Sequence, residues 1–158
     1  MLFRSTEADG ETSGGIIHVR RAPLTAFEAD ANNCPDLFPI LAVLAAFCEG
    51  VSAIRGTDRL AGKESDRAGA ILDMLWQMGV KAAIEDDTLM VEGHSLSSRL
   101  VNGDLLPSGS YTSGHDHRMV MALRVAELAA AGPFIIDDTV CVEKSFPTFP
   151  DLFEHFIG

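Results

Sequence analysis

The sequence predicts an α/β fold made of repeated β-α-β-α-β-β units, and two observations lead to it. Two apolar segments of similar length, residues 37–48 and 119–131, each have the pattern of a buried helix followed by a glycine and a short strand. An aspartate, Asp36 or Asp116, stands before each segment where a helix would start. Self-similarity of this kind indicates one supersecondary unit that is used more than once.

The spacing of charged residues supports the same repeat. Lys63 follows Asp36 after 27 positions, and Lys144 follows Asp116 after 28. After the last predicted helix, the second copy leaves no residues for the two closing strands that the first copy has. We therefore expect about two units, and we expect the chain to be part of a larger fold.

Each element has a local signal. Pro39 falls in the first turn of the helix at 37–48, where its missing N–H costs nothing, and Gly50 ends that helix. Residues 65–78 form an amphipathic helix with one apolar stripe and Gly79 at its C-terminal end. The expected strands are 16–19, 24–27, 51–54, a hairpin of 80–84 and 89–91 around Asp86 and Asp87, and 134–136, and the last helix is 150–156.

The domain organisation follows from composition and from the repeat. Residues 1–15 are polar and rich in glycine, so we expect a flexible N-terminal lead-in. Residues 16–158 should form a partial domain of two units, roughly 16–95 and 96–158. One ordinary hydrophobic core is within reach of a chain of this size.

Composition also excludes several classes of partner. The chain has 12 basic and 23 acidic side chains and a net charge of −11, whereas nucleic-acid and anionic-membrane partners need a basic face. Its three cysteines have no close pairing, which argues against a disulfide framework and for a reducing, cytoplasmic location. The longest apolar run is too short to cross a bilayer, and residues 1–4 do not resemble a signal peptide.

Charged residues cluster where the predicted helices begin: Asp36, residues 63–67, residues 116–118 and Lys144. Helix N-termini offer free N–H groups and the positive end of the macrodipole, so they bind anions without a Gly-rich loop. Neither a dinucleotide fingerprint nor a P-loop motif is present. We therefore expect a phosphate- or carboxylate-binding site at these helix starts, with Asp36 and Glu64 available for proton transfer.

Each of these residues taken alone has a simpler explanation. Asp36 could be only a helix cap, Lys144 a solvated lysine, and residues 116–118 a cap with a surface ion pair. The pair His115 and His117 could suggest a metal, but no further ligands stand at a suitable spacing, so we expect no metal site. Only their joint occurrence at equivalent places in a repeat favours a binding site.

Four short motifs carry a resemblance to a known family. They are Asn33-Cys34-Pro35-Asp36, Lys63-Glu64-Ser65-Asp66-Arg67, Asp116-His117-Arg118 and Lys144-Ser145-Phe146-Pro147. In order and spacing they resemble the signatures of the EPSP synthase family, over nearly all of residues 16–158. The resemblance implies two domains of three units each, whose buried parallel helices point their N-termini into the interdomain cleft. This chain would hold roughly the last two of the six units.

The resemblance implies which residues bind shikimate-3-phosphate and which transfer protons. Asp36 matches the carboxylate that contacts the 5-hydroxyl of shikimate-3-phosphate and accepts its proton. Lys63 matches a lysine beside that hydroxyl. Glu64 matches the acid that works on the methylene of phosphoenolpyruvate. By this resemblance Asp36 and Lys63 bind shikimate-3-phosphate, and Asp36 and Glu64 are catalytic.

The resemblance also implies a site for phosphoenolpyruvate. Arg67, Arg118 and Lys144 match the cations that hold this substrate, and His117 matches a catalytic histidine that supports them. Arginine suits this task because its guanidinium can bind a carboxylate or phosphate in a bidentate manner. Because equivalent helix starts share one edge of a repeat fold, we expect the carboxylates and cations to converge around one open, solvent-facing concavity. The residues of this prediction are Asp36, Glu64, Arg67, Arg118 and Lys144, and we expect the cations to be exposed to solvent.

The implied reaction transfers the enolpyruvyl group of phosphoenolpyruvate to the 5-hydroxyl of shikimate-3-phosphate, in the shikimate pathway of aromatic amino-acid synthesis, without metal or organic cofactor. This chain would supply the phosphoenolpyruvate-facing half of the site and would be inactive alone. Two alternatives stay open: a fragment of a nucleotide-sugar enolpyruvyl transferase, and a non-catalytic binding module of the same fold. Two departures from the family pattern are Ala61-Gly62, where many relatives have Arg and an aliphatic residue, and His115, where Asn or Gly is usual.

Overall fold

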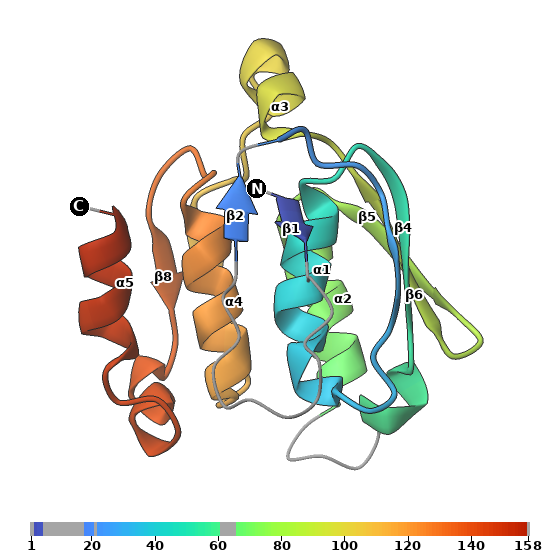
Figure 1. Cartoon of the computed structure of the whole chain (residues 1–158). Coiled ribbons are helices and arrows are strands. Elements are labelled where there is room, and N and C mark those ends of the chain that lie inside the picture. Colours follow the sequence, from blue (N-terminus) through green and yellow to red (C-terminus); the bar gives the residue numbers. More distant parts are fainter. Residues whose placement is uncertain (1, 5–17, 21, 61–65, 158) are drawn as a thin grey trace.

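The computed structural model describes residues 2–4, 18–20, 22–60 and 66–157 (Figure 1). The N-terminal elements are strands β1 (Leu2–Arg4), β2 (His18–Arg20), β3 (Glu28–Asp30) and β4 (Gly50–Arg55), helix α1 (Phe38–Ala46), and the 3-10 turns η1 (Pro35–Leu37) and η2 (Thr57–Leu60). They are followed by helix α2 (Arg67–Gln77), strands β5 (Lys81–Glu85) and β6 (Thr88–Gly93), and helix α3 (Leu96–Asn102). The C-terminal elements are β7 (Gly109–Tyr111), α4 (His117–Glu127), β8 (Phe134–Ile136), the 3-10 turn η3 (Thr139–Lys144) and α5 (Phe149–Ile157).

Two parallel strand pairs show the predicted repeat directly. In β3–β4 each residue pairs with the residue 25 positions further on, as Glu28 does with Ala53. In β7–β8 the spacing is again 25, as for Gly109 and Phe134. A helix connects the two strands of each pair, α1 in the first and α4 in the second, as parallel pairing requires. The repeated α/β unit is therefore confirmed.

The two units are offset by a constant 81 positions, both between β3 and β7 and between β4 and β8. An isolated parallel bridge before each strand pair repeats with the same offset. These bridges are Thr25–Glu49 and Leu106–Ala130. The segments between the strands are equally long, so they match without a gap. With this offset, Asp36 of the first unit aligns with His117 of the second unit. The spacing of the charged residues suggests an alignment of Asp36 with Asp116 instead, which is one position earlier.

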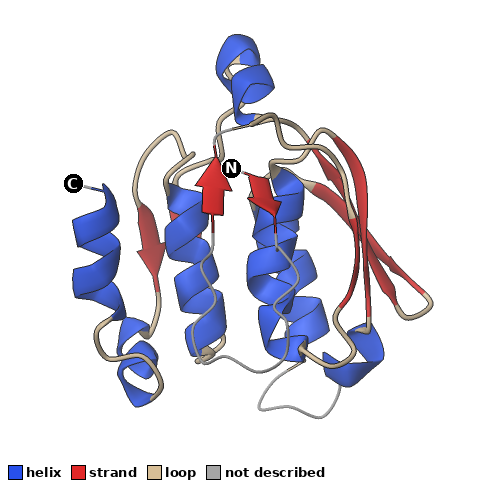
Figure 2. Ribbon diagram, in the orientation of Figure 1, coloured by secondary structure: helices blue, strands red, loops and turns tan. Residues whose placement is uncertain are grey.

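The elements form layers, with the sheet β3-β4-β6-β5 on one side and α5 on the other (Figure 2). Helix α1 contacts β4 and β6 of this sheet, and α2 contacts β5. Helix α4 packs on α1 and carries β8 and η3 against its far side. In Figure 1 helices α1, α2, α4 and α5 run in the same direction, so their N-termini lie at the same end of the molecule.

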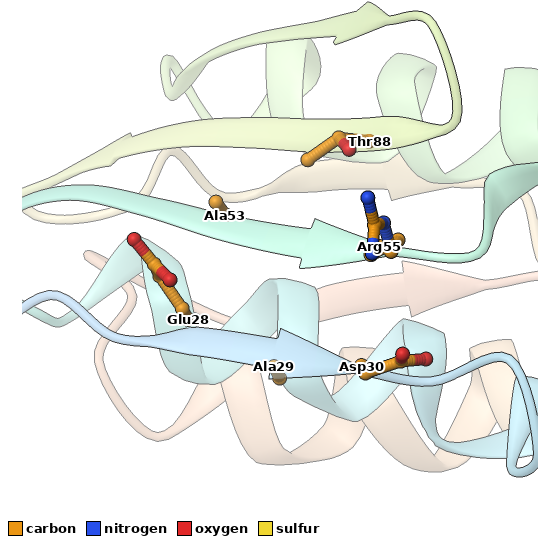
Figure 3. Close-up of a pocket in the computed structure, with 6 residues that line it drawn as sticks. All are labelled: Glu28, Ala29, Asp30, Ala53, Arg55 and Thr88. Carbon is orange, nitrogen blue, oxygen red and sulfur yellow. The ribbon is translucent and has the colours of Figure 1, made fainter.

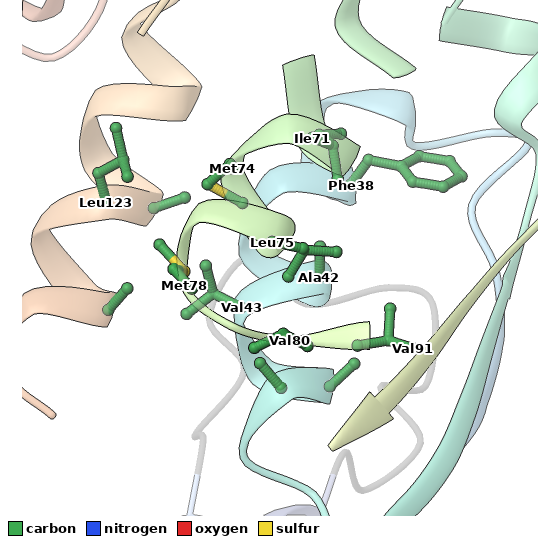
Figure 4. Packing of buried hydrophobic residues seen from close by; sticks show 14 of the residues in the cluster. Phe38, Ala42, Val43, Ile71, Met74, Leu75, Met78, Val80, Val91 and Leu123 are labelled. Carbon is green, nitrogen blue, oxygen red and sulfur yellow. The ribbon is translucent and has the colours of Figure 1, made fainter. Parts of the chain in front are cut away.

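The core lies between these helices and the sheet (Figure 4). Phe38 and Val43 of α1 meet Met74 and Leu75 of α2, and Leu123 of α4 closes the cluster. All five side chains are at most 2% exposed. Each contributes about 1.5–3 kcal/mol by leaving water. This packing fixes the ends of α1, α2 and α4 relative to one another.

Helix α1 is less completely buried than its uniformly apolar sequence predicts. Ile40 in its first turn is 36% exposed, and Leu37 just before the helix is 48% exposed. The described elements in contact with α1 include α2, α4, β4 and β6, and they leave this side of the helix uncovered. The prediction of a buried helix is therefore wrong for this face.

Several boundaries differ from the expected ones. The strand expected at 24–27 is displaced to β3, and α4 ends at Glu127 rather than near residue 131. Helix α2 begins two residues later than expected because Asp66 caps it, accepting a hydrogen bond from the backbone N–H of Gly69 at 3.1 Å. The hairpin β5–β6 and strand β8 agree with the expected positions.

The N-terminal segment is only partly described. Residues 2–4 form β1, which pairs antiparallel with β2, although a flexible lead-in is expected from the composition. The rest of residues 1–15 lies outside the described residues. Among the described residues, no helix combines the length and apolar character needed to cross a membrane.

Candidate active site

The N-termini of α1, α2 and α4 lie close together because equivalent β-α connections of a repeat end on the same edge. Asp36 belongs to η1, the 3-10 turn that leads into α1. Arg67 is the first residue of α2, and Arg118 is the second residue of α4. These three residues span 82 positions in the chain but meet through direct hydrogen bonds.

One carboxylate bridges the two arginines. Oδ1 of Asp36 accepts a hydrogen bond from Nη1 of Arg67 at 3.2 Å. Oδ2 of the same residue accepts one from Nη2 of Arg118 at 2.8 Å. Both carboxylate oxygens of Asp36 are thereby engaged by cations from two different units of the repeat. The predicted convergence of these three residues agrees with the structure.

Asp116 is a second carboxylate at this place, and the predicted site residues do not include it. Its Oδ2 accepts a hydrogen bond from Nε of Arg67 at 2.7 Å. Its Oδ1 caps α4 by accepting the backbone N–H of Arg118 at 2.9 Å. Asp116 therefore fixes one guanidinium and the start of the helix that carries the other. The sequence indicated a cap with a surface ion pair here, but the side chain of Asp116 is only 6% exposed.

The arginines are less accessible than expected. The side chain of Arg67 is 4% exposed, because Asp116 and Asp36 cover its guanidinium. The side chain of Arg118 is 27% exposed, and that of Asp36 is 51% exposed. The expectation of solvent-exposed cations is therefore wrong for Arg67, and it holds only in part for Arg118. Buried guanidinium groups of this kind are stable only when their donors find acceptors.

The environment of Asp36 changes its pKa in two opposite ways. Partial burial raises the pKa of the carboxyl, but the positive charges and hydrogen bonds of Arg118 and then Arg67 outweigh it. The net result is a pKa below the ordinary value for aspartate. In this arrangement Asp36 is ionised and is a weak proton acceptor.

The other predicted residues lie at varying distances from this centre. Nδ1 of His117 is 4.0 Å from Oδ1 of Asp116, and its side chain is 20% exposed. Lys144 ends η3, and within the described part of the chain no hydrogen bond or ion pair joins it to Asp36 or Asp116. Its charge acts instead on His115. Lys63 and Glu64 lie outside the described residues.

Comparison with known proteins bears directly on this geometry. The sequence profile of the family described as EPSP synthase (3-phosphoshikimate 1-carboxyvinyltransferase) matches residues 6–153. The chain belongs to the EPSP synthase family. Asp36, Arg67, Asp116 and Arg118 all fall within the matched region. Their convergence therefore concerns a part of the chain that the family shares.

Individual relatives agree with this assignment. The chain is 37% identical over 149 residues to a 3-phosphoshikimate 1-carboxyvinyltransferase of Aeropyrum pernix, covering 94% of this chain and 33% of that protein. It is 42% identical over 136 residues to the enzyme of the same name from Thermococcus kodakarensis, covering 85% of this chain and 31% of that protein. The chain thus spans about a third of the length of these curated relatives.

Solved structures show the same fold. An EPSP synthase from Acinetobacter baumannii matches with a TM-score of 0.65 and 33% identity, covering 75% of this chain and 26% of that one. An enolpyruvyl transferase, NikO from Streptomyces tendae, matches with a TM-score of 0.63 and 23% identity, covering 85% of this chain and 28% of that one. The second likeness concerns the fold alone.

The departure at His115 has a structural explanation. His115 has a φ of 62°, in the left-handed region where Gly and Asn are favoured. The histidine keeps this conformation, and its Nδ1 lies 2.5 Å from Oδ2 of Asp138. Asp138 also has a positive φ, 39°, at the start of η3. The pair links the loop before α4 to the segment that carries Lys144.

This link predicts a pH dependence. The hydrogen bond and the negative charge of Asp138 raise the pKa of His115 above its ordinary value. The stabilising contribution of the pair is complete below the unfolded-state pKa of about 6.5 and is lost as the pH rises through the folded-state pKa. We expect the His115 imidazole to titrate above the ordinary histidine value when it is followed by NMR.

The control for this titration is a pair of charge-matched variants. Asp138→Asn should return the His115 midpoint to the ordinary range, whereas Asp73→Asn on the exposed face of α2 should leave it unchanged. An unshifted midpoint in the unmodified protein would contradict the observed pairing.

The described residues also contain a hollow of about 380 Å³ on the sheet, and neither Arg67 nor Arg118 is among the residues that line it (Figure 3). Glu28 and Asp30 of β3, Arg55 of β4 and Thr88 of β6 are among the residues that line it. None of the predicted site residues is among them. Asp30 and Arg55 are register partners on the same face of the sheet, and both are exposed, so this hollow is part of the solvent-facing side of the sheet. The described residues hold no group of three or more His, Cys, Asp or Glu that could bind a metal ion.

Proposed function

We propose that this chain takes part in the transfer of the enolpyruvyl group from phosphoenolpyruvate to the 5-hydroxyl of shikimate-3-phosphate. One observation carries the proposal. Arg67 and Arg118, from two different units of the repeat, converge on one carboxylate at the N-termini of α2 and α4. Two guanidinium groups at helix N-termini suit a ligand with several anionic oxygens, such as phosphoenolpyruvate.

The remaining residues take the roles that the family resemblance implies. Arg67, Arg118 and Lys144 hold phosphoenolpyruvate, and His117 supports the arginines from the first turn of α4. Arg67 is prepared for this role because Asp116 holds its Nε and its Nη1 donates to Asp36. Fixed cations of this kind stabilise negative charge in a transition state without reorganisation.

The proton transfers belong to the carboxylates. Asp36 accepts the proton of the 5-hydroxyl, and the family resemblance assigns Lys63 to the same hydroxyl. Glu64 delivers a proton to the methylene carbon of phosphoenolpyruvate. The addition gives a tetrahedral adduct. Phosphate then leaves from this adduct as Glu64 takes a proton back from the methyl carbon, which restores the enolpyruvyl double bond. This chemistry needs paired proton donors and acceptors and fixed cations, and we propose no metal or organic cofactor.

The location and the partners follow the same proposal. The substrates are phosphoenolpyruvate and shikimate-3-phosphate, with no nucleic acid and no membrane. We place the reaction in the cytoplasm because Cys34, Cys48 and Cys141 all carry free thiols, as expected in a reducing compartment. Turnover requires further polypeptide, comparable to the other two thirds of the curated relatives, because a site with one wall leaves the reacting hydroxyl unpositioned.

Titration of this chain with phosphoenolpyruvate tests the proposal. The amides of residues 66–67 and 116–118 should shift first in a ¹H–¹⁵N NMR spectrum, since they lie at the two helix starts. Arg118→Gln should weaken binding at least about ten-fold, the usual order for a charge-assisted bidentate contact.

The matched control is Arg124→Gln. Arg124 is on the same helix and pairs with Glu127 at 2.8 Å, one to two turns from the site. Its removal changes the net charge equally and should alter affinity by less than about two-fold. Shifts confined to other parts of the chain, or equal effects of both variants, would show that these helix starts are not the binding site.

A further inference from the structure

The place between Arg67 and Arg118 is filled by a carboxylate of the protein itself. Each oxygen of Asp36 takes one guanidinium hydrogen bond, at 3.2 Å from Arg67 and 2.8 Å from Arg118. A carboxylate or phosphate group of a ligand would use the same donors in the same manner. A ligand can use these two donors only after Asp36 has left them.

The two carboxylates at this site differ in how firmly they are held. Asp116 is 6% exposed, caps α4 and binds Nε of Arg67, so it cannot leave without exposing buried charge. Asp36 is 51% exposed, and no side-chain cap bond ties it to η1 or α1. Asp36 is therefore the displaceable member of the pair, and Asp116 is the fixed one.

We propose that Asp36 acts as an internal anion that occupies the arginine site and must be displaced before phosphoenolpyruvate binds. This inference rests on the proposed function and adds a displacement step to it. Phosphoenolpyruvate takes over the guanidinium donors of Arg67 and Arg118 and releases Asp36 to face the 5-hydroxyl of shikimate-3-phosphate. Asp36 then becomes able to accept a proton.

The electrostatics of the site support this displacement. While Asp36 bridges the arginines, their charges lower its pKa, although its partial burial acts in the opposite direction. The charged and titratable groups at this place are Arg67, Arg118, Asp116 and His117. A ligand that neutralises both arginines removes the groups that lower the pKa and adds negative charge nearby. Displacement therefore makes Asp36 more basic.

The decisive variant is Asp36→Asn, because the two possible roles of Asp36 predict opposite changes in ligand affinity. Loss of a residue that binds the ligand weakens binding, whereas loss of an internal competitor strengthens it. If Asp36 competes with the ligand, Asp36→Asn binds phosphoenolpyruvate and inorganic phosphate at least about ten-fold more tightly than the unmodified chain. Calorimetry or NMR titration measures both ligands. Asp73→Asn removes the same charge from the exposed side of α2 and should change affinity by less than about two-fold.

A second measurement uses the unmodified protein and does not depend on the variant's fold. The ¹³C signal of the Asp36 carboxyl gives its titration midpoint, which should rise when phosphoenolpyruvate saturates the chain. An unchanged midpoint overturns the inference.

The outcomes separate this inference from the proposed function. Tighter binding by Asp36→Asn supports both, even where binding by the unmodified chain is too weak to measure. Binding that Arg118→Gln abolishes but that Asp36→Asn does not strengthen overturns the internal-anion role and leaves the proposed function standing. If neither the unmodified chain nor Asp36→Asn binds either ligand, both are overturned.

Discussion

Gly93→Ala is expected to lower the free energy of unfolding by about 3 kcal/mol, the upper part of the range for overpacking. Gly93 ends β6 where the strand passes the C-terminal end of α1. A Cβ atom at this position would overlap the backbone carbonyl oxygens of Ala45 and Cys48. These oxygens belong to the main chain, so they cannot rotate away as a side chain can. Urea denaturation followed by circular dichroism would measure the loss.

The matched control is Gly79→Ala. Gly79 follows α2 with a φ of +71°, and a Cβ there would meet no atom within 4 Å. The substitution introduces left-handed strain alone and should cost about 1 kcal/mol. Equal losses for the two variants would show that the contact with the end of α1 is not what requires glycine at position 93.

The parts of the fold that the sequence predicts are those with a strong local pattern. Residues 134–136 are an apolar run and form β8, and 80–84 and 89–91 flank a turn and form the hairpin β5–β6. The repeat was also predictable, since similar spacings of charged residues reflect strand registers that are equal in both units. Such elements follow from periodicity and turn chemistry alone.

Helix α3 is an element that the local sequence pattern does not predict. It has a cap at Ser95, whose side chain accepts the N–H of Ser98, and a left-handed Gly103 after its end. These are ordinary start and stop signals, but the helix has no buried apolar stripe. Leu100 is 60% exposed and Val101 is 86% exposed. A seven-residue helix without such a stripe gives no periodic signal to find.

The candidate site was predictable in outline because the repeat requires it. Asp36, Arg67 and Arg118 meet since equivalent helix starts share one edge, and this follows from topology. The burial of Arg67 and the double role of Asp116 depend on side-chain geometry between residues 49 positions apart. The spacing of residues in the sequence does not determine that geometry. The sequence therefore indicated the cap at Asp116 but not its buried ion pair with Arg67.

Asp116→Ala is expected to destabilise the protein by about 4 kcal/mol, within the range for breaking a buried ion pair by removing one partner. Arg67 would keep only Asp36 as a partner, and α4 would lose its cap. Because the guanidinium of Arg67 would also lose its fixed direction, binding of phosphoenolpyruvate should weaken. Urea denaturation and the NMR titration measure the two effects in the same variant.

The control that isolates the buried pair is Asp66→Ala. Asp66 caps α2 through Gly69 as Asp116 caps α4 through Arg118, but Asp66 is exposed and the structure gives it no ion pair among the described residues. Loss of such a cap alone should cost about 1 kcal/mol. Adding Arg67→Met to Asp116→Ala should recover part of the stability, because no unpaired buried charge then remains. If Asp116→Ala costs no more than Asp66→Ala, the ion pair with Arg67 contributes nothing to stability, and Asp116 acts only as a cap.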